Sequence, residues 1–227
     1  MIPNIIAIDG PAASGKSTVA RLLAETLDYL FFDTGVMYRA VTWALLQSGV
    51  DLQDVDAVTK TAESVQIDVH PPSADDGRAY DVLMDGVDVT WDIRKPEVDA
   101  NVSVVSAYPG VRQALTVQQR RVGHRGKVVM VGRDIGTVVL PDADLKVYLD
   151  ASAEERARRR FRESTARGEI VDYEDVLSAM KKRDQIDSTR DIAPLRAAED
   201  AIRIDSDELS IEQVLDRVKT LVFQRSE

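Results

Sequence analysis

The stretch from Gly10 to Thr18 reads GPAASGKST and directly follows the apolar run Ile5-Ile6-Ala7-Ile8. It matches the pattern G-x-x-x-x-G-K-[ST], in the strand-then-helix context that a phosphate-binding loop needs. Glycines let backbone N–H groups surround a β-phosphate, and the following helix adds its positive dipole. Lys16 can reach the β- and γ-oxygens, and the Ser17 hydroxyl can ligate Mg²⁺. The predicted nucleotide-binding residues of this loop are Gly10, Pro11, Ala12, Ala13, Ser14, Gly15, Lys16, Ser17 and Thr18.

A second group of residues suited to chemistry is a cluster of arginines in a chain whose formal net charge is -10. The cluster comprises Arg156, Arg158, Arg159, Arg160, Arg162 and Arg167. It could be a solvated helix face paired with glutamates at i,i+4. Beside a phosphate-binding loop, however, arginines that stabilise charge on a transferred phosphoryl group are favoured. We therefore predict a lid segment at 153–170, with Arg156 and Arg160 as catalytic groups and Arg159 as a nucleotide ligand.

Alternating strands and helices must position these groups. The pattern predicts a strand at Asn4–Asp9, a helix at Lys16–Leu27, a strand at Leu30–Asp33 and a helix through Tyr38 and Leu46. The same alternation resumes near Pro109, with a helix carrying Val111, Leu115 and Val117. Later segments are strands at Lys127–Val131, Leu145–Leu149 and Ala201–Ile204, and helices capped by Ser152, at Tyr173–Asp187 and after Ser210. This order favours an α/β fold in which helices flank a parallel sheet, forming a single P-loop kinase domain over 1–227.

Residues 65–93 interrupt that alternation, after a helix expected near Asp54–Ser64. Val65–His70, Ala79–Met84 and Val87–Thr90 read as short strands, and the Asp85-Gly86 dipeptide between the last two is a strong signal for a two-residue hairpin turn. The segment is therefore predicted to be a small inserted subdomain of antiparallel strands.

Composition excludes several classes of function. The 227 residues include no cysteine and two histidines, so disulfides and thiolate metal sites are excluded. Net negative charge argues against general binding to nucleic acid or to an acidic membrane. No run approaches the ~18 apolar residues of a membrane helix, and the start lacks a signal-peptide pattern, so a cytoplasmic location is expected.

Phosphate-binding loops serve hydrolysing switches and motors as well as small-molecule kinases. The guanine motif N-K-x-D of the GTPases is absent from the sequence. A kinase needs an acceptor pocket and basic groups that close over the transferring phosphoryl group while water is excluded. The arginine-rich segment suits that role, so a kinase is the favoured interpretation.

Five stretches, the phosphate-binding loop among them, make the chain similar to the bacterial cytidylate kinases, a branch of the nucleoside monophosphate kinases. They are I-x-I-D-G-P-x-x-x-G-K-S-T at 6–18, D-T-G-x-x-Y-R at 33–39, V-x-x-Y-P-x-V-R within 104–112, G-R-D-I-G-T-V-V at 132–139 and R-D-x-x-D-S-x-R at 183–190. The resemblance spans the whole chain and includes the insert, which implies that the insert binds the monophosphate. It also implies ATP as donor, CMP or dCMP as acceptor, and a monomer.

The resemblance assigns the acceptor phosphate to a set of guanidinium groups. Arg39 resembles a phosphate fork, while Arg133 and Arg190 resemble the other ligands and are carried over as catalytic groups. Thr34 would add a hydroxyl. The alternative for the three arginines is ordinary surface salt bridging.

The same resemblance places the cytosine base and the sugar. Cytosine presents an exocyclic amine where uracil presents a carbonyl, so a carboxylate can discriminate between them, and Asp134 is the candidate. Ser103 and Arg112 match positions that reach the rest of the base, and Arg112 can also hold Asp134. Arg183 and Asp187 resemble the pair that engages the ribose, although an ordinary i,i+4 ion pair is the alternative.

The predicted reaction is transfer of the γ-phosphoryl group of MgATP to CMP or dCMP, giving ADP and CDP or dCDP. Catalysis is expected from positioning and charge neutralisation by Lys16, Mg²⁺ and the arginines, without a dedicated general base. The alternatives are a kinase for another small acceptor, such as UMP, AMP or shikimate, and a P-loop protein that binds nucleotide without catalysis. Asp9, at the end of the first strand, has two interpretations: orienting Lys16 or the magnesium shell, or capping the loop.

Overall fold

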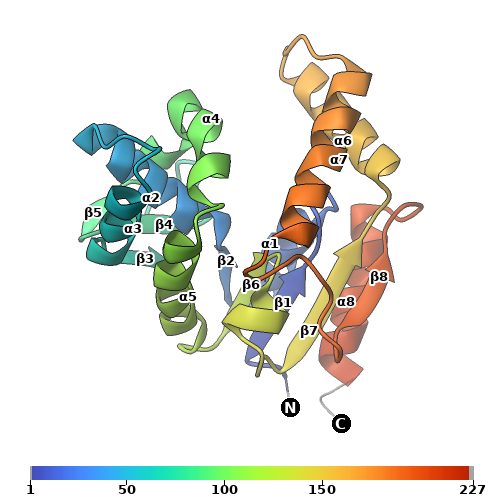
Figure 1. The fold of residues 1–227 in the computed structure, drawn as a ribbon. Coiled ribbons are helices and arrows are strands. Elements are labelled where there is room, and N and C mark those ends of the chain that lie inside the picture. The colour runs from blue at the N-terminus through green and yellow to red at the C-terminus, as the bar shows by residue number, and fades with distance from the viewer. Residues whose placement is uncertain (1, 225–227) are drawn as a thin grey trace.

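A five-stranded parallel sheet forms the centre of the molecule in the computed structural model, which describes residues 2–224 (Figure 1). The strand order is β2-β6-β1-β7-β8. The strands are β1 (Ile5–Asp9), β2 (Leu30–Asp33), β6 (Val128–Gly132), β7 (Leu145–Asp150) and β8 (Ile202–Asp205). The predicted parallel sheet is thereby confirmed, and no strand end differs from the predicted one by more than one residue.

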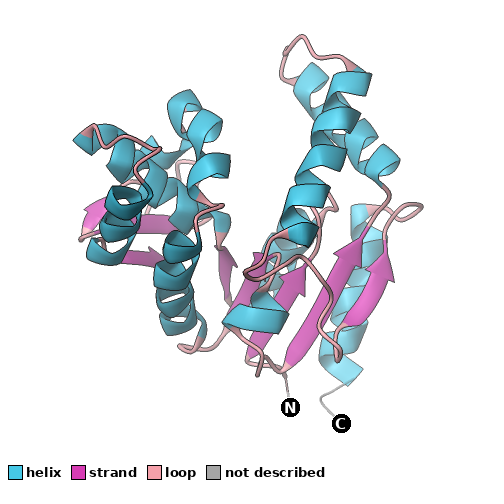
Figure 2. Cartoon of the chain, in the orientation of Figure 1, coloured by secondary structure: helices cyan, strands magenta, loops and turns pink. Residues whose placement is uncertain are grey.

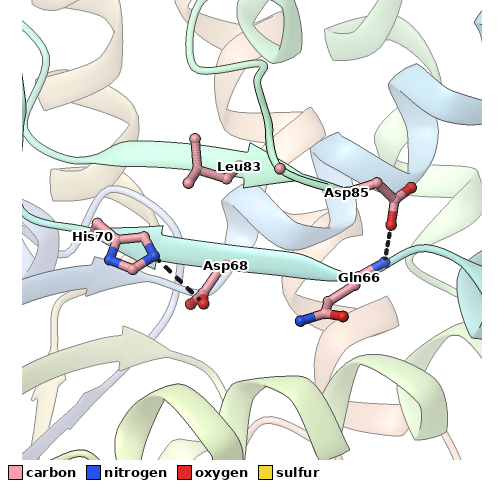
Figure 3. Close-up of a pocket in the computed structure, with 6 residues that line it drawn as sticks. Gln66, Asp68, His70, Leu83 and Asp85 are labelled. Atoms are coloured by element: carbon pink, nitrogen blue, oxygen red, sulfur yellow. Dashed lines mark hydrogen bonds and ion pairs between the residues drawn. The ribbon is translucent and has the colours of Figure 1, made fainter.

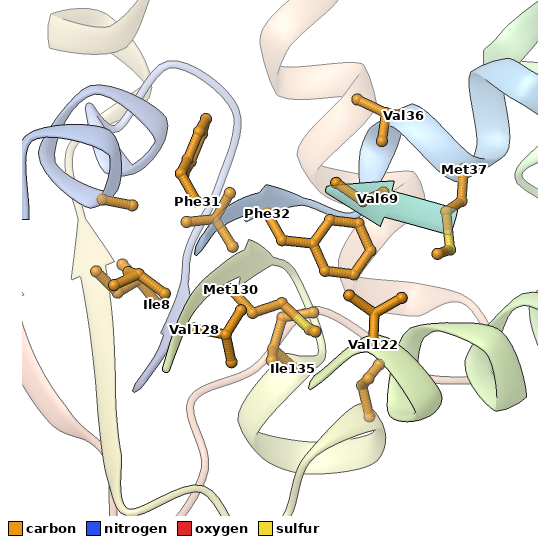
Figure 4. Close-up of a cluster of buried hydrophobic side chains, with 14 of the residues drawn as sticks. Ile8, Phe31, Phe32, Val36, Met37, Val69, Val122, Val128, Met130 and Ile135 are labelled. Carbon is orange, nitrogen blue, oxygen red and sulfur yellow. The ribbon is translucent and has the colours of Figure 1, made fainter. Parts of the chain in front are cut away.

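Helices cover the sheet, as Figure 2 shows. Helix α1 (Lys16–Leu27) packs on β1 and β6 and against α8 (Ile211–Gln224). All five residues of β6 are buried, which fits a parallel strand enclosed on both faces. Phe32 and Met130, neither of them exposed, form part of the buried cluster in Figure 4 with residues of α2 (Gly35–Ser48) and α5 (Pro109–Gly123).

The small antiparallel sheet has the order β3-β4-β5 and lies within the predicted segment 65–93. Its strands are β3 (Ile67–His70), β4 (Asp81–Met84) and β5 (Val87–Asp88). Asp85 and Gly86, with φ of 51° and 81°, form the turn between β4 and β5. Both residues are left-handed, as a type I′ hairpin turn requires. Helix α3 (Val55–Ser64) packs against α5, which in turn contacts β3.

Three elements were not predicted. Helix α4 (Pro96–Val105) and a short 3-10 turn η1 (Asp92–Arg94) follow the small sheet, and a π-helical turn η2 (Ile135–Val139) follows β6. Of the three apolar residues named for α5, Val111 and Leu115 are fully buried, whereas Val117 is 67% exposed. Positions 111 and 115 are one helical turn apart, while 117 projects from the opposite side.

Two antiparallel helices, α6 (Ala153–Ala166) and α7 (Tyr173–Thr189), rise beyond the ends of the strands to which the arrowheads point (Figure 1). The Ser152 hydroxyl accepts a hydrogen bond from the Glu155 N–H, as the capping pattern predicts. Helix α4 stands at the same end of the sheet on the other side (Figure 1). Within residues 2–224, no helix combines the length and apolar character needed to cross a membrane.

Candidate active site

The phosphate-binding loop connects the end of β1 to α1 at the carboxyl edge of the sheet. A Cβ at Gly10 would lie 2.1 Å from the Leu149 carbonyl oxygen, so the loop passes β7 too closely for any side chain there. Gly15 has a φ of 93° and precedes α1 without a side-chain cap from any residue that the structure describes. The first N–H groups of α1 are thus left for a ligand, as anion sites at helix N-termini require.

Lys16 is buried, and its Nζ donates to the Pro11 carbonyl oxygen at 2.9 Å, across the loop. Burial, followed by the positive charge of Arg133, lowers the pKa of Lys16 to about 7. A phosphate group beside the ammonium would reverse this shift by favouring the charged form.

Asp33, at the end of β2, contacts the phosphate-binding loop and was not among the predicted site residues. The Ser17 hydroxyl donates to its Oδ2 at 3.0 Å, and its Oδ1 accepts from the Gly35 N–H at 3.0 Å. A hydroxyl beside a carboxylate is a donor set that Mg²⁺ prefers. The available signal was its place in D-T-G at the end of a strand that neighbours the loop strand.

Asp9 caps the turn that follows β6 rather than its own loop. Its two carboxyl oxygens accept from the N–H groups of Ile135 and Gly136 at 2.8 and 2.7 Å. Burial raises the pKa of Asp9 to about 7. The contact fixes η2, and with it the position of Asp134, next to the phosphate-binding loop.

Asp134 and Arg112 form a buried ion pair at the predicted base site. Arg112 Nη2 donates to Asp134 Oδ2 at 2.9 Å, and the two side chains are 6% and 10% exposed. The guanidinium carbon of Arg112 lies 5.4 Å from the centre of the Tyr38 ring. Arg112 Nε and Arg190 Nη2 are buried without a hydrogen-bond partner among the residues that the structure describes. Such groups suit a polar ligand.

Three arginines converge on Asp187. Arg133 Nε donates to its Oδ2, Arg190 Nη1 donates to its Oδ1 at 3.3 Å, and Arg183 Nε lies 4.0 Å from Oδ2. The i,i+4 ion pair with Arg183, which was the alternative interpretation, is thus the most distant of the three. Burial, with the charges of other arginines, lowers the pKa of both Arg183 and Arg190. The cluster concentrates positive charge that a phosphate dianion would relieve.

Arg39, Thr34 and Ser103 differ in how they relate to this cluster. Arg39 reaches from α2 to the Ile93 carbonyl oxygen at 3.2 Å and to Asp99 of α4 at 2.5 Å. The buried Thr34 hydroxyl donates to the Val131 carbonyl oxygen at 3.0 Å. Ser103 is exposed on α4, and Arg112 instead contacts the Ser106 carbonyl oxygen at 3.3 Å. The structure therefore brings Arg112, but not the Ser103 side chain, to Asp134.

The three favoured lid arginines do not behave alike. Arg156 Nη1 donates to the Ala12 carbonyl oxygen at 3.2 Å, and Arg159 Nη1 donates to that of Ser14 at 3.4 Å, so both reach the phosphate-binding loop. Arg160 is half-exposed and pairs with Glu163 at 3.1 Å.

A surface hollow on the small sheet lies apart from this site (Figure 3). Its lining residues are Gln66, Asp68, His70, Leu83, Asp85 and Gly86. Asp68 lies 3.4 Å from His70 Nε2 and 2.7 Å from Arg125 Nη2, and the Gln66 N–H donates to Asp85. Asp68 thus has a cationic partner in Arg125, and the hollow shares no residue with the phosphate-binding loop.

A P-loop beside a cluster of converging arginines, on a five-stranded parallel sheet, is the arrangement of the P-loop small-molecule kinases. A solved shikimate kinase from Acinetobacter baumannii, in complex with shikimate, has a similar fold, with a TM-score of 0.51 and 17% identity over 99% of this chain and 95% of that one.

The sequence comparisons specify the family. The cytidylate kinase family model matches residues 6–224. A cytidylate kinase of Roseiflexus castenholzii is 51% identical over 224 residues, covering 98% of this chain and 95% of that protein. A cytidylate kinase of Bacillus subtilis is 45% identical over 221 residues, covering 97% of each. The chain belongs to the cytidylate kinase family.

Proposed function

We propose that this protein transfers the γ-phosphoryl group of MgATP to CMP and dCMP, giving ADP with CDP or dCDP. The observation that carries the proposal is the buried Arg112–Asp134 pair, which lies beside the arginines around Asp187 and at the same sheet edge as the phosphate-binding loop. A carboxylate for the base and guanidinium groups for the monophosphate are what a cytidine nucleotide requires.

The donor nucleotide occupies the loop from Gly10 to Thr18 in this proposal. Free N–H groups at the start of α1 bind the β-phosphate, and Lys16 leaves the Pro11 carbonyl oxygen for the β- and γ-oxygens. Ser17 and Asp33 would hold Mg²⁺ and its water shell. When bound, Mg²⁺ would neutralise charge on the transferring phosphoryl group.

The acceptor lies between η2, α5 and α7. Asp134 accepts from the exocyclic amine of cytosine while the hydrogen bond from Arg112 orients its carboxylate. Arg133, Arg190 and Arg39 bind the monophosphate, and Arg183 with Asp187 engages the ribose. The monophosphate oxygen is already an anion at neutral pH, so the chain's task is to align it with the donor and to exclude water.

The proposal extends to the organisation of the chain. Segment 65–93 is a subdomain on the acceptor side, and segment 153–170 is a lid carrying the donor-side arginines Arg156 and Arg159, with Arg160 as a third arginine whose present partner is Glu163. The protein acts as a cytoplasmic monomer on small-molecule nucleotides and uses neither nucleic acid nor a membrane.

A coupled assay of ADP formation tests the proposal. MgATP is supplied with CMP, dCMP, UMP, AMP or GMP at equal concentration. Preference for CMP and dCMP supports both the loop and the cytosine pocket. Turnover led by another acceptor retains a kinase and refutes the role of Asp134, and nucleotide binding without turnover of any acceptor refutes the kinase.

A further inference from the structure

Asp184 is a carboxylate on α7 that faces α6. Its Oδ1 accepts from Arg156 Nη1 at 3.0 Å and its Oδ2 accepts from Arg156 Nη2 at 2.5 Å, so the contact is two-pronged. Figure 1 shows the two helices side by side. Bidentate pairs of this type fix the orientation of a guanidinium group as well as its place.

The rest of the Arg156 head group is held by the protein backbone. Its Nε donates to the Ala151 carbonyl oxygen at 2.9 Å, and its Nη1 also donates to the Ala12 carbonyl oxygen of the phosphate-binding loop at 3.2 Å. The side chain is 4% exposed. Every nitrogen of the guanidinium group therefore has a partner, and the group can occupy only one place beside the loop.

Asp184 is the charged member of that set of partners. Arginine stays protonated at any ordinary pH, so burying it requires a countercharge, which the two carbonyl groups do not supply. Arg160, four residues further along α6, pairs with Glu163 at the surface. Arg156, which pairs with Asp184, lies at the loop, whereas Arg160, which pairs with Glu163, lies in solvent. The position of each arginine thus goes with the carboxylate that it pairs with.

We propose that Asp184 is a positioning residue for phosphoryl transfer: it holds the guanidinium group of Arg156 at the phosphate-binding loop, where that group meets the γ-phosphate of the donor. The proposal rests on the proposed function. It assigns Asp184 to the donor side of α7, whereas Asp187, three residues later, belongs to the acceptor side.

The test compares Asp184→Asn with a matched control, Glu154→Gln. Glu154 pairs with Lys181 at 2.8 Å and also joins α6 to α7, but both of these side chains are about half exposed. We expect Asp184→Asn to lower kcat about tenfold or more, the range seen when a charge-stabilising group is displaced. The KM for CMP should stay within twofold. Glu154→Gln should match the unaltered protein in both constants.

Two further measurements separate positioning from structural damage. Asp184→Glu should restore part of the lost kcat, and Asp184→Asn should have less than a twofold additional effect in an Arg156→Ala background. Calorimetry with a non-hydrolysable ATP analogue should show a severalfold rise in Kd for Asp184→Asn and no change for Glu154→Gln. The thermal unfolding of each variant shows whether it is folded.

Unchanged or increased kcat and analogue affinity in folded Asp184→Asn would overturn the proposal. An equal loss with and without Arg156 would do the same, because Asp184 would then act through another group. Failure of the proposed function is distinguishable, because the unaltered protein would then not phosphorylate CMP. In that case the affinity of Asp184→Asn for the ATP analogue still tests whether Asp184 holds Arg156 at the loop.

Discussion

Lys16 illustrates how a single side chain can report on the occupancy of the whole site. Burial and the nearby Arg133 lower its pKa to about 7, so at pH 8.5 the amine is mostly neutral in the free protein. Phosphate oxygens would favour the ammonium form and raise the pKa again. Nucleotide binding at pH 8.5 is therefore coupled to proton uptake.

Calorimetry of MgADP binding at pH 8.5, in two buffers of different ionisation enthalpy, measures that uptake. We expect close to one proton to be taken up per nucleotide bound by the unaltered protein. Lys16→Met removes the titrating amine and should show no uptake, no turnover and an intact fold by circular dichroism. An equal uptake in both proteins would mean that another group takes up the proton.

Asp134 is the residue on which base specificity depends in the proposed function. Asp134→Asn replaces an acceptor by a group that is also a donor and removes the countercharge of Arg112, which is 6% exposed. We expect kcat/KM for CMP to fall about a hundredfold and the ratio of CMP to UMP to fall about tenfold or more, since each matched base contact is worth about 1–3 kcal/mol. The acceptor panel measures both quantities.

Asp142→Asn is the control for that substitution. Asp142 is two-thirds exposed and lies 3.6 Å from the ring of His124 at the surface. Its replacement should leave the ratio of CMP to UMP unchanged. A ratio that stays the same in Asp134→Asn would move base recognition elsewhere in the site.

At the scale of elements, local signals predicted the parts of the fold that local chemistry determines. The Ser152 cap and the left-handed Asp85-Gly86 turn are confirmed because each depends on a few neighbouring residues. Helix α4 was not predicted, since its valines recur without a clear apolar face and only Val98 and Val105 are buried. Neither was the turn η2, which depends on Asp9, about 126 residues earlier.

The contacts of the candidate site could be predicted only in part for the same reason. The residues from Gly10 to Thr18 follow each other along the chain, so their type and spacing were sufficient to predict a loop between a strand and a helix. The pairing of Asp187 with Arg133, and of Asp184 with Arg156, depends on how α7 sits against β6 and α6. The position of α7 relative to these elements is set by tertiary packing. Residue spacing within one helix predicts only contacts inside that helix.

Substitutions at Gly86 test the geometry of the turn between β4 and β5 of the small sheet. Gly86 has a φ of 81°, and a Cβ there would meet nothing within 4 Å, so any penalty comes from backbone conformation alone. Gly86→Ala should lower the free energy of unfolding by about 1–2 kcal/mol. Gly86→Asn should cost less, because asparagine tolerates the left-handed region. Urea unfolding of the two variants compares them, and equal stabilities would contradict the turn geometry.

At the scale of the whole molecule, global and local charge oppose each other. The chain has a net charge of -10, which alone would repel an anionic nucleotide, yet the acceptor site gathers Arg133, Arg183 and Arg190 around one carboxylate. At physiological salt, screening acts over about 8 Å. We therefore expect the nearby arginines to outweigh the remote acidic surface and the proposed acceptor site to attract a dianion.

Thermal unfolding with CMP and with cytidine tests that balance, because the two ligands share the base and sugar and differ by the phosphate. We expect CMP to raise Tm well above the value with cytidine at the same concentration, since a ligand at a hundred times its Kd stabilises by about 2.7 kcal/mol. The difference should shrink as NaCl is raised from about 0.05 to about 0.5 M, where the screening length is shorter. Arg133→Gln should abolish most of it. If cytidine and CMP stabilised equally at low salt, the arginines around Asp187 would not be the phosphate site, and the acidic surface would govern the approach of the ligand.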